Sequence, residues 1–509
     1  MTLRPRTAHR ILFLCGVLVP AFAATTPADE AAPPKPAAFR VVFDRAVSAA
    51  PFTGRVYVLL SAKEPKQLPS GPNWFAPEPF FAVDVKDWRP GETLAVGADA
   101  LGFPAPLSKL KQGAYYVQAV MDFDRGARSF SAAEGNGYSR PVRADLDPRA
   151  GGSVALTIDQ VYHAKPFPET ERVKLVDIES KLLTEFYGRP THLRAGVVLP
   201  ESFAKDPQRR YPVVYEVPGF GGTHLGAVNA AARKATDVAG VEMLHVVLDP
   251  SCRLGHCVFA DSANNGPCGQ ALVEELIPFV EKEYRGLGTP NARFVTGHSS
   301  GGWSSLWLQV TYSDFFGGVW STSPDPVDFR DFQRIDLTTP GANLYTDGDG
   351  KPRPLARVGG KPVLYFKSFS DMETVMGHGG QLASFEAAFG PRGPDGKPRR
   401  LWDRATGVVD PETARAWEKY DIHLTLERDW KTLGPKLRGK LHLYAGADDT
   451  FYLEGAVRLL RESLKRLGSD ADVEIVPGRD HGTLLDGRMR ERIAHEMADA
   501  FRRGQARQE

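Results

Sequence analysis

The segment Arg293-Phe294-Val295-Thr296-Gly297-His298-Ser299-Ser300-Gly301 decides the fold class that the sequence predicts. The apolar run at its start predicts a buried strand, and a helical pattern begins at Ser300. Gly297 and Gly301 flank Ser299 in a G-x-S-x-G pattern, which is typical of a serine on a sharp turn between a strand and a helix. Small residues on both sides let the strand and the helix pass close together. The pattern therefore predicts a nucleophile elbow; the alternative is a glycine-rich helix cap.

Strand-like and helix-like segments alternate on both sides of this turn. Such alternation predicts an α/β fold with a mostly parallel sheet covered by helices. Together with the nucleophile elbow it indicates the α/β-hydrolase type. The predicted strands are Arg172–Leu182, Thr191–Leu199, Pro212–Val217, Leu244–Leu248, Lys440–Tyr444 and Ala471–Val476, and the predicted helices are Ala271–Tyr284, Leu453–Leu467 and Met489–Phe501.

Residues 39–160 show a different pattern, with short β-type runs separated by Gly, Pro, Asp and Asn. This spacing predicts an N-terminal β-sandwich-like domain. We expect the hydrolase domain over 165–505, with an insertion at about 323–437 that forms either a lid over the active site or a peripheral decoration. The aromatic residues Trp74, Phe75, Phe80 and Phe81 are either a binding face for sugar or ordinary core and loop packing.

The first 38 residues predict export. Arg4, Arg6 and Arg10 precede an apolar run that is too short to span a bilayer, and Ala21-Phe22-Ala23 offers small residues to a signal peptidase. We expect a signal peptide over 1–23, a flexible linker over 24–38, and a periplasmic or secreted protein without stable membrane insertion after cleavage. The alternative is an uncleaved membrane anchor.

A serine nucleophile needs a base to take its proton and an acid to orient that base. In α/β-hydrolases the acid and then the histidine follow the serine along the chain. Asp449 lies on the loop after the strand that ends at Tyr444, and His481 lies on the glycine-rich loop after the last strand. The sequence therefore predicts a Ser299–His481–Asp449 triad, whereas His298 is expected to pack beneath the elbow.

The oxyanion of the tetrahedral intermediate needs preorganised N–H donors. We expect one from the backbone of Ser300, the residue after the nucleophile. The second is expected from the segment Pro218-Gly219-Phe220-Gly221-Gly222, with Phe220 preferred and Gly221 next. The alternative for this segment is an ordinary glycine-rich turn.

The net charge of the chain is close to zero. The chain carries 63 basic and 62 acidic side chains, so its charge gives no electrostatic argument for a nucleic-acid partner.

Two of the cysteines Cys252, Cys257 and Cys268 can form a disulfide in an oxidising compartment. The competing interpretation is a metal site that includes His256, although the spacing lacks the paired C-x-x-C pattern of zinc sites. We predict no metal and no organic cofactor for the reaction.

From about Val173 to Phe501 the chain resembles the “Putative esterase” family of α/β-hydrolases, which includes esterase D (S-formylglutathione hydrolase), feruloyl esterases, enterochelin esterases and mycolyltransferases. The family's acid usually falls within a G-x-x-D-x-F pattern, which implies Asp449 rather than Asp448. Pro218 departs from the family, because many members have histidine or another polar residue there. Besides the elbow, the resemblance lies in Tyr211–Gly222, Glu274–Glu281, Gly446–Phe451 and Pro477–Gly482.

These inferences predict an exported serine carboxylic ester hydrolase that forms an acyl-enzyme on Ser299. We expect a small-molecule or glycan ester as the substrate. Three alternatives stay open: an acyltransferase with the same triad, an amidase or peptidase, and a non-catalytic secreted binding protein that works through its β-rich domain. The sequence does not indicate the oligomeric state.

Overall fold

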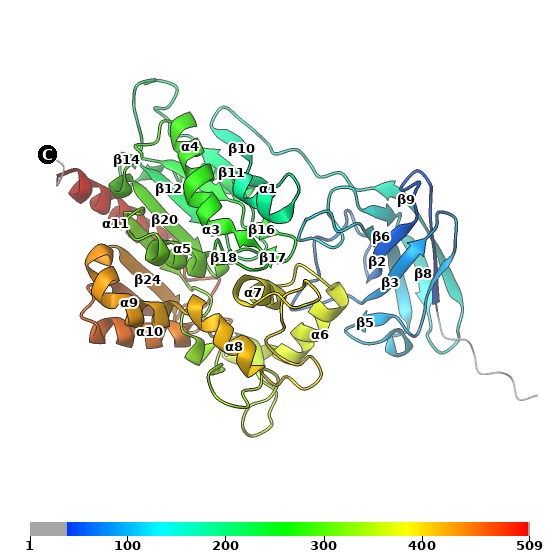
Figure 1. Cartoon of the computed structure of the whole chain (residues 1–509). Helices are drawn as coiled ribbons and strands as arrows, with labels where there is room; N and C mark the ends of the chain where they lie inside the picture. The colour runs from blue at the N-terminus through cyan, green and yellow to red at the C-terminus, as the bar shows by residue number, and fades with distance from the viewer. Residues whose placement is uncertain (1–37, 507–509) are drawn as a thin grey trace, which may run out of the picture.

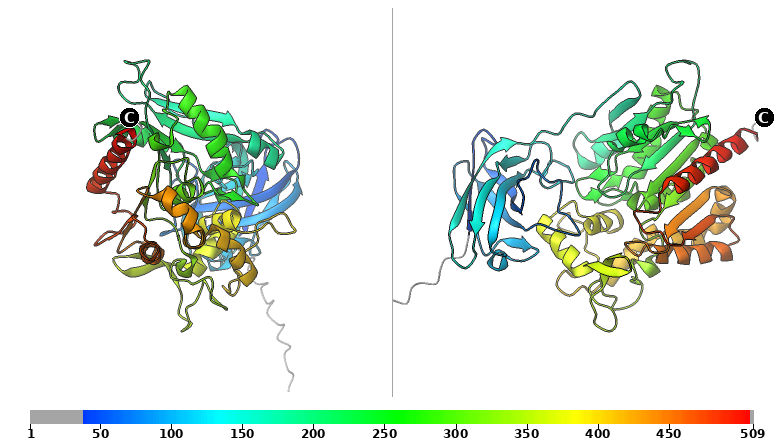
Figure 2. Two further views of the ribbon diagram at one scale, coloured as in Figure 1. Left: turned by 60° about the vertical axis from the view of Figure 1, so that its left-hand side comes forward. Right: turned by 180° about the vertical axis from the view of Figure 1, so that it is seen from behind.

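The computed structural model describes residues 38–506, and Figures 1 and 2 show a β-rich region at one end of the molecule and a larger α/β region at the other. The predicted signal peptide and residues 24–37 of the predicted linker lie outside the described residues. Between residues 38 and 506, no helix is both long enough and apolar enough to cross a membrane.

The β-rich region is built from nine strands in one hydrogen-bonded sheet, in the order β4-β1-β9-β7-β6-β2-β3-β5, with β8 also paired to β6. The two separate sheets of a sandwich are therefore not confirmed. Alternate residues such as Val56 and Val58 face a buried core because successive side chains on a strand point to opposite sides. The strands are β1 (Ala38–Phe43), β2 (Phe52–Ser61), β3 (Phe80–Trp88), β4 (Leu94–Val96), β5 (Leu101–Phe103), β6 (Gly113–Asp122), β7 (Gly137–Ser139), β8 (Val142–Leu146) and β9 (Ser153–Val161).

The α/β region has an eight-stranded sheet in the order β10-β11-β15-β12-β20-β21-β24-β25. The sheet is mixed: β10, β11 and β15 pair antiparallel, and the remaining neighbours pair parallel. The strands are β10 (Val173–Glu179), β11 (His192–Val198), β12 (Val213–Val217), β15 (Leu244–Leu248), β20 (Arg293–His298), β21 (Gly318–Thr322), β24 (Leu441–Gly446) and β25 (Asp472–Val476).

Helices cover both faces of this sheet, as Figure 1 shows for α5 and α11. Phe294 of β20 packs in the cluster that includes α11, whereas its neighbour Val295 packs in the main core with α5. This alternation fixes which side of the sheet each helix covers. The helices are α1 (Lys181–Tyr187), α2 (Gly226–Ala232), α3 (Cys268–Ala271), a π-helical turn (Leu272–Leu276), α4 (Ile277–Glu283), α5 (Ser300–Thr311), α10 (Glu454–Arg466) and α11 (Gly487–Ala506).

Two local differences from the predicted elements have clear causes. The segment predicted as one strand over Arg172–Leu182 divides into β10 and α1, because the Ser180 hydroxyl accepts a hydrogen bond from Leu183 N at 3.1 Å and begins a helix. Strand β21, which follows the helix after the elbow, was not predicted. Short paired strands also occur at β13 (Asp237–Val238), β14 (Val241–Glu242), β16 (Ser251–Cys252), β17 (Gly255–His256), β18 (Asp261–Ser262) and β19 (Gly266–Pro267).

Between β21 and β24 the chain leaves the sheet and forms a helical layer; its α6 end lies against the β-rich region, whereas α9 packs against α5 and α10 (Figure 1). His378, in the turn between α6 and α7, forms a 2.7 Å ion pair with the buried Asp122 of β6. Tyr57 donates a hydrogen bond to the carbonyl of Met376, so this layer is fixed to the β-rich sheet. The elements are β22 (Pro354–Val358), β23 (Lys361–Tyr365), α6 (Phe366–Met376), α7 (Gln381–Phe389), α8 (Pro411–Trp417) and α9 (Ile422–Leu437), and single 3₁₀ turns occur in the chain at Leu107–Lys109, Pro290–Ala292, Phe329–Asp331 and Glu418–Tyr420.

Candidate active site

Ser299 lies on the turn between β20 and α5, with φ of 61° and ψ of −126°. A positive φ is unusual for a residue with a side chain and marks local backbone strain. A Cβ atom at Gly301 would overlap the carbonyl oxygen of Val217, and one at Gly297 would overlap the backbone of Gly301. The two glycines are therefore required by the close approach of β12, β20 and α5, and the turn has the strand–helix geometry that the sequence predicts.

His481 and Asp449 come together from the loops after β25 and β24. His481 Nδ1 lies 2.9 Å from Asp449 Oδ2, and Asp449 Oδ1 accepts a hydrogen bond from Phe451 N at 2.9 Å. Burial raises the pKa of Asp449, but the hydrogen bond and charge of His481 outweigh burial and lower this pKa below its ordinary value. Asp448 is exposed to solvent, so the structure brings Asp449 rather than Asp448 onto the imidazole.

Ser299 and His481 line the same cavity, which has a volume of about 250 Å³. Within residues 38–506, Ser299 Oγ makes no hydrogen bond to His481. Catalytic hydrogen bonds are often long before substrate binds and tighten in the complex. The walls are mostly aromatic and apolar, with Trp74, Phe220, Phe369, Phe385, Phe451 and Leu355 among the lining residues.

His298 lies beside His481, the candidate base. Its ring centroid is 4.4 Å from that of His481, and its Nδ1 lies 3.1 Å from Thr322 Oγ1. Burial, together with the nearby His481, lowers the pKa of His298 to about 3. His298 is therefore a neutral ring that lines the cavity beside His481, and its expected packing beneath the elbow stays a prediction.

The expected oxyanion donors lie on two sides of Ser299. Ser300 is the first residue of α5, so its N–H has no acceptor within the helix. Phe220 lines the cavity, and in the described part of the chain its N–H donates to no protein group. A Cβ at Gly219 would lie 3.0 Å from the carbonyl oxygen of His298, so this glycine lets the loop approach the elbow. Both amides are free to bind an oxyanion.

His256 supports this loop from behind. Its Nε2 donates to the carbonyl oxygen of Pro218 at 2.9 Å, and its Nδ1 accepts a hydrogen bond from Val258 N at 3.0 Å. Burial lowers the pKa of His256 to about 4, so the ring is neutral at physiological pH. Both ring nitrogens are occupied, which excludes His256 as a metal ligand in this arrangement.

A family model described as “Putative esterase” matches residues 189–462, which is more than half of the chain. The chain belongs to this esterase family. It is therefore an enzyme that hydrolyses carboxylic esters, and its mixed sheet with helices on both faces is the α/β-hydrolase fold of the family.

Other comparisons find more distant likenesses. No curated protein matches the chain. Among solved structures, a ferulic acid esterase is 15% identical, with 65% of this chain and 98% of that chain covered and a TM-score of 0.41. The S-formylglutathione hydrolase of Agrobacterium tumefaciens is 14% identical (65% and 95% covered, TM-score 0.39). The fluorophosphonate-binding serine hydrolase FphF of Staphylococcus aureus is 13% identical (65% and 98% covered, TM-score 0.38).

Asp325, Gln381 and Trp74 are among the cavity residues of this esterase that were not predicted as site residues. Asp325 is 6% exposed, follows β21, and accepts hydrogen bonds from Ser300 Oγ at 2.5 Å and from Gln381 Nε2 at 3.4 Å. Burial raises the pKa of Asp325 to about 6. Gln381 begins α7 in the predicted insertion, so the insertion lines the cavity. Trp74 comes from the β-rich region and had been considered only for sugar binding or packing.

The four aromatic residues Trp74, Phe75, Phe80 and Phe81 were expected to form either a binding face for sugar or ordinary core and loop packing. Phe80 and Phe81 are buried on β3, so they are core residues. Phe75 is 50% exposed. Only Trp74 of these four lines the active-site cavity.

The three cysteines within residues 38–506, Cys252, Cys257 and Cys268, are free thiols, which corrects the expected disulfide. Cys268 Sγ donates to the carbonyl oxygen of Asn265 at 3.2 Å, and Cys252 Sγ lies 3.7 Å from Asn265 Oδ1. Two of the thiols are thus directed at hydrogen-bond acceptors rather than joined in a disulfide.

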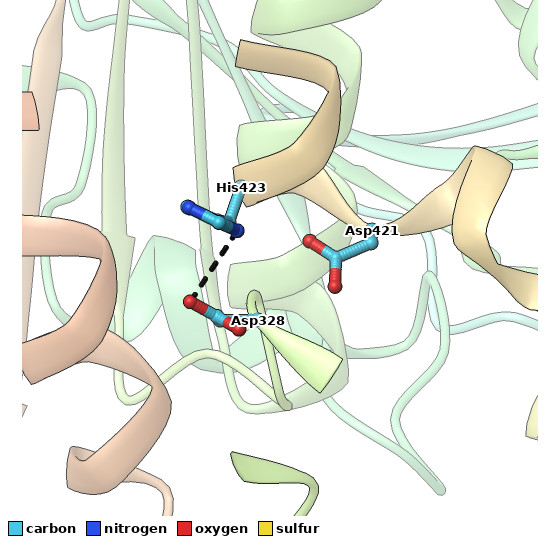
Figure 3. A group of neighbouring side chains, drawn as sticks. All are labelled: Asp328, Asp421 and His423. Carbon is cyan, nitrogen blue, oxygen red and sulfur yellow. Dashed lines mark ion pairs between the residues drawn. The ribbon is translucent and has the colours of Figure 1, made fainter. Parts of the chain in front are cut away.

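One buried group has the composition of a metal site, with Asp328, Asp421 and His423 close together (Figure 3). His423 Nδ1 lies 3.5 Å from Asp328 Oδ2. Arg330, however, binds both oxygens of Asp328 at 2.9 and 2.6 Å. Both oxygens of Asp421 accept backbone N–H groups, from Leu424 and Phe329. The carboxylates therefore already have partners, and we assign no metal here.

A second group, formed by His442, Asp472 and Glu496, also has the composition of a metal site. Arg492 pairs with Asp472 at 2.8 Å and with Glu496 at 2.7 Å. In both groups an arginine supplies the positive charge that buried or half-buried carboxylates need.

Proposed function

We propose that this member of the esterase family is an exported serine carboxylic ester hydrolase that works through an acyl-enzyme on Ser299. The observation that supports the proposal is the shared cavity. The strained Ser299 and His481, whose Nδ1 lies 2.9 Å from Asp449, line one aromatic pocket together with Phe220.

In the first half of the proposed reaction, Ser299 Oγ attacks the ester carbonyl carbon and its proton passes to His481 Nε2. Asp449 accepts the Nδ1–H hydrogen bond and stabilises the imidazolium that forms. The N–H groups of Phe220 and Ser300 bind the oxyanion of the tetrahedral intermediate. The bond to the alcohol oxygen then breaks, and His481 returns the proton to the leaving alcohol.

In the second half, water attacks the acyl carbon and gives its proton to His481. The bond between the acyl carbon and Ser299 Oγ breaks, the carboxylic acid leaves, and the proton returns to the serine. The chemistry uses only these side chains and backbone amides. The same acyl-enzyme passes its acyl group to an alcohol if an alcohol displaces water, so hydrolysis and transfer differ only in the second nucleophile.

The cavity supports a particular kind of substrate. Its aromatic walls favour an apolar or aromatic portion of a small-molecule or glycan ester. A volume of about 250 Å³ suits a group no larger than a small ligand.

A panel of 4-nitrophenyl esters with acyl chains of increasing length tests the function. We expect wild-type protein and the exposed-site control Ser108→Ala to hydrolyse the short and aromatic members. Ser299→Ala should lose activity by about 10⁴-fold or more with an unchanged circular dichroism spectrum. Product analysis with added methanol separates hydrolysis from acyl transfer. Retained hydrolysis in Ser299→Ala contradicts the proposed mechanism.

Export is tested separately from chemistry. The proposal predicts that protein recovered from the periplasm or medium begins at Ala24, which intact mass spectrometry reads directly. Protein that keeps residues 1–23 and stays with the membrane fraction contradicts export.

A further inference from the structure

We propose that the β-rich region supplies a second substrate subsite, in which Arg128 binds an anionic group of the ester. This inference rests on the proposed function and concerns which esters the enzyme prefers. It assigns the β-rich region a part in substrate selection.

The subsite is a cavity of about 180 Å³ that adjoins the active-site cavity. The two cavities share Trp74, Phe220 and Gln381 as walls. Five lining residues come from the β-rich region: Ser70, Gly71, Pro72 and Trp74 from the loop between β2 and β3, and Arg128 from the loop between β6 and β7. Because Phe220 belongs to the oxyanion loop, a ligand in this cavity lies next to the reacting carbonyl.

Arg128 is a half-buried cation without an anionic partner. Its guanidinium carbon lies 5.0 Å from the centroid of the Phe220 ring. Within residues 38–506 its side chain makes no ion pair and no hydrogen bond. Burial lowers the pKa of Arg128, which shows that its surroundings disfavour the charge. Buried charges in proteins normally have a partner, so the missing partner is expected from a ligand.

Two neighbouring arginines, unlike Arg128, form ion pairs with carboxylates. Arg55 pairs with Asp84 at 2.7 Å, and Arg253 pairs with Asp124. Both lie at the same junction between the β-rich and α/β regions, where carboxylates are therefore common. Arg128 alone of these three is directed into a cavity instead.

The acidic groups nearest the subsite have partners of their own. Glu373 lines the cavity, but its two carboxylate oxygens accept the N–H groups of Leu382 and Ala383 at 2.9 Å each, at the start of α7. Burial raises the pKa of Glu373 to about 7, which weakens its charge further. Asp249, which attracts Arg128 from a distance, binds His224 at 2.6 Å. The charged group of the cavity that lacks a partner is therefore the Arg128 cation.

The position of Arg128 is fixed by packing. Gly379 of the α6–α7 turn lies against the Arg128 backbone so closely that a Cβ there would overlap the Arg128 carbonyl oxygen. The neighbouring His378 is held by Asp122, as described above. Trp74 forms the partition between the two cavities: its ring centroid is 4.9 Å from that of Phe369 and 5.7 Å from that of Phe220. Packing therefore fixes the Arg128 backbone and the aromatic walls of the subsite before a ligand binds, and such preorganisation favours binding.

The chemistry of the guanidinium defines the ligand class. Its planar donors match the oxygens of a carboxylate or a phosphate, often with two parallel hydrogen bonds. The cavity has room for one small group of this kind. We infer a substrate in which a short spacer separates an oxyanion from the scissile ester, on either the acyl or the alcohol side.

Matched ester pairs test the proposal. On the acyl side the pair is 4-nitrophenyl hemisuccinate and 4-nitrophenyl butyrate; on the alcohol side it is 4-acetoxybenzoate and 4-acetoxybenzamide. We expect Arg128→Gln to lower kcat/KM for the anionic member of one pair by about 10-fold to 100-fold, the loss typical of a charged hydrogen bond. The neutral member should change by less than about twofold. Arg125→Gln, an exposed arginine on the same loop, serves as the control.

Trp74→Ala and a binding experiment complete the test. Trp74→Ala should reduce the discrimination between anionic and neutral members because the partition is lost. Calorimetric titration of the wild-type protein with succinate and with 4-hydroxybenzoate measures binding without turnover, and Arg128→Gln should abolish it. An equal loss for anionic and neutral esters in Arg128→Gln, or wild-type protein that neither prefers nor binds anions, overturns the subsite. Failure of the wild-type protein to hydrolyse any ester of either kind, anionic or neutral, overturns the proposed function instead.

Discussion

His256 donates a hydrogen bond from Nε2 to the carbonyl oxygen of Pro218 at 2.9 Å, and this contact holds the loop that carries Phe220. Many members of the resembling family have a polar residue where this chain has Pro218. Here the support comes from a neutral imidazole behind the loop. We propose that His256 acts as a positioning residue for Phe220, the expected oxyanion donor.

Replacing His256 with alanine should lower kcat more than it raises KM, because the oxyanion forms only in the transition state. We expect a loss in kcat of about 10-fold to 100-fold, somewhat less than for a lost donor. His495→Ala, at an exposed histidine of α11, is the control. A His256→Ala enzyme with wild-type kcat and raised KM speaks against the positioning role.

The same histidine predicts an acid-sensitive fold. Its pKa is lowered to about 4 in the folded protein, against 6.5 in the unfolded chain, so below pH 6.5 the unfolded state takes up a proton first. Its contribution to stability is complete above pH 6.5 and is lost as the pH falls toward 4, by about 1.4 kcal/mol per pH unit.

Urea unfolding at several pH values between 4.5 and 7.5 measures this slope. His256→Gln keeps a donor for Pro218 but does not titrate, so its unfolding free energy should fall less steeply with acid than that of the wild type. Equal slopes for the two proteins contradict the assignment.

Adjacent aspartates provide a matched test of the acid. Asp449→Asn should lower kcat by about 10⁴-fold because the amide favours the wrong histidine tautomer, whereas Asp448→Asn should change it by less than about threefold. Steady-state rates on one activated ester decide between them. A larger loss for Asp448→Asn refutes the choice of Asp449.

The elbow predicts a strong requirement for glycine at one position. Gly301→Ala forces a Cβ onto the Val217 carbonyl oxygen, so unfolding free energy should fall by about 3 kcal/mol and activity by about 100-fold. Gly348→Ala, where a Cβ meets nothing within 4 Å, should leave both unchanged. Thermal melts and ester assays check this, and a fully stable, active Gly301→Ala protein disproves the close approach.

Much of the fold could be predicted because its signals are local. The core strands of the large sheet are short apolar runs, and a G-x-S-x-G turn between a strand and a helix is recognisable within nine residues. The pairing of the β-rich strands is not local: one continuous sheet and a two-sheet sandwich have the same alternation along each strand. Strand β21 was missed because its five residues, Gly318–Thr322, include Ser and Thr beside a single Val and Trp.

The residues of the candidate site also fall into two sets: those with a local sequence signal, and those that only the tertiary packing brings to the cavity. Ser299, Asp449 and His481 each follow a strand, so their order along the chain placed them together. Asp325 follows β21 and was missed with that strand. Trp74 reaches the cavity from a loop more than two hundred residues away in sequence, and only the packing of the β-rich region against the insertion shows that it belongs there.

The most direct test of the central claim is the mass of the enzyme during turnover. The wild-type protein is mixed with 4-nitrophenyl butyrate, quenched in acid within milliseconds, and analysed by intact mass and peptide mapping. The account predicts one butyryl group on the peptide that contains Ser299 and none in Ser299→Ala. A butyryl group on another residue, or full turnover by Ser299→Ala, would contradict it.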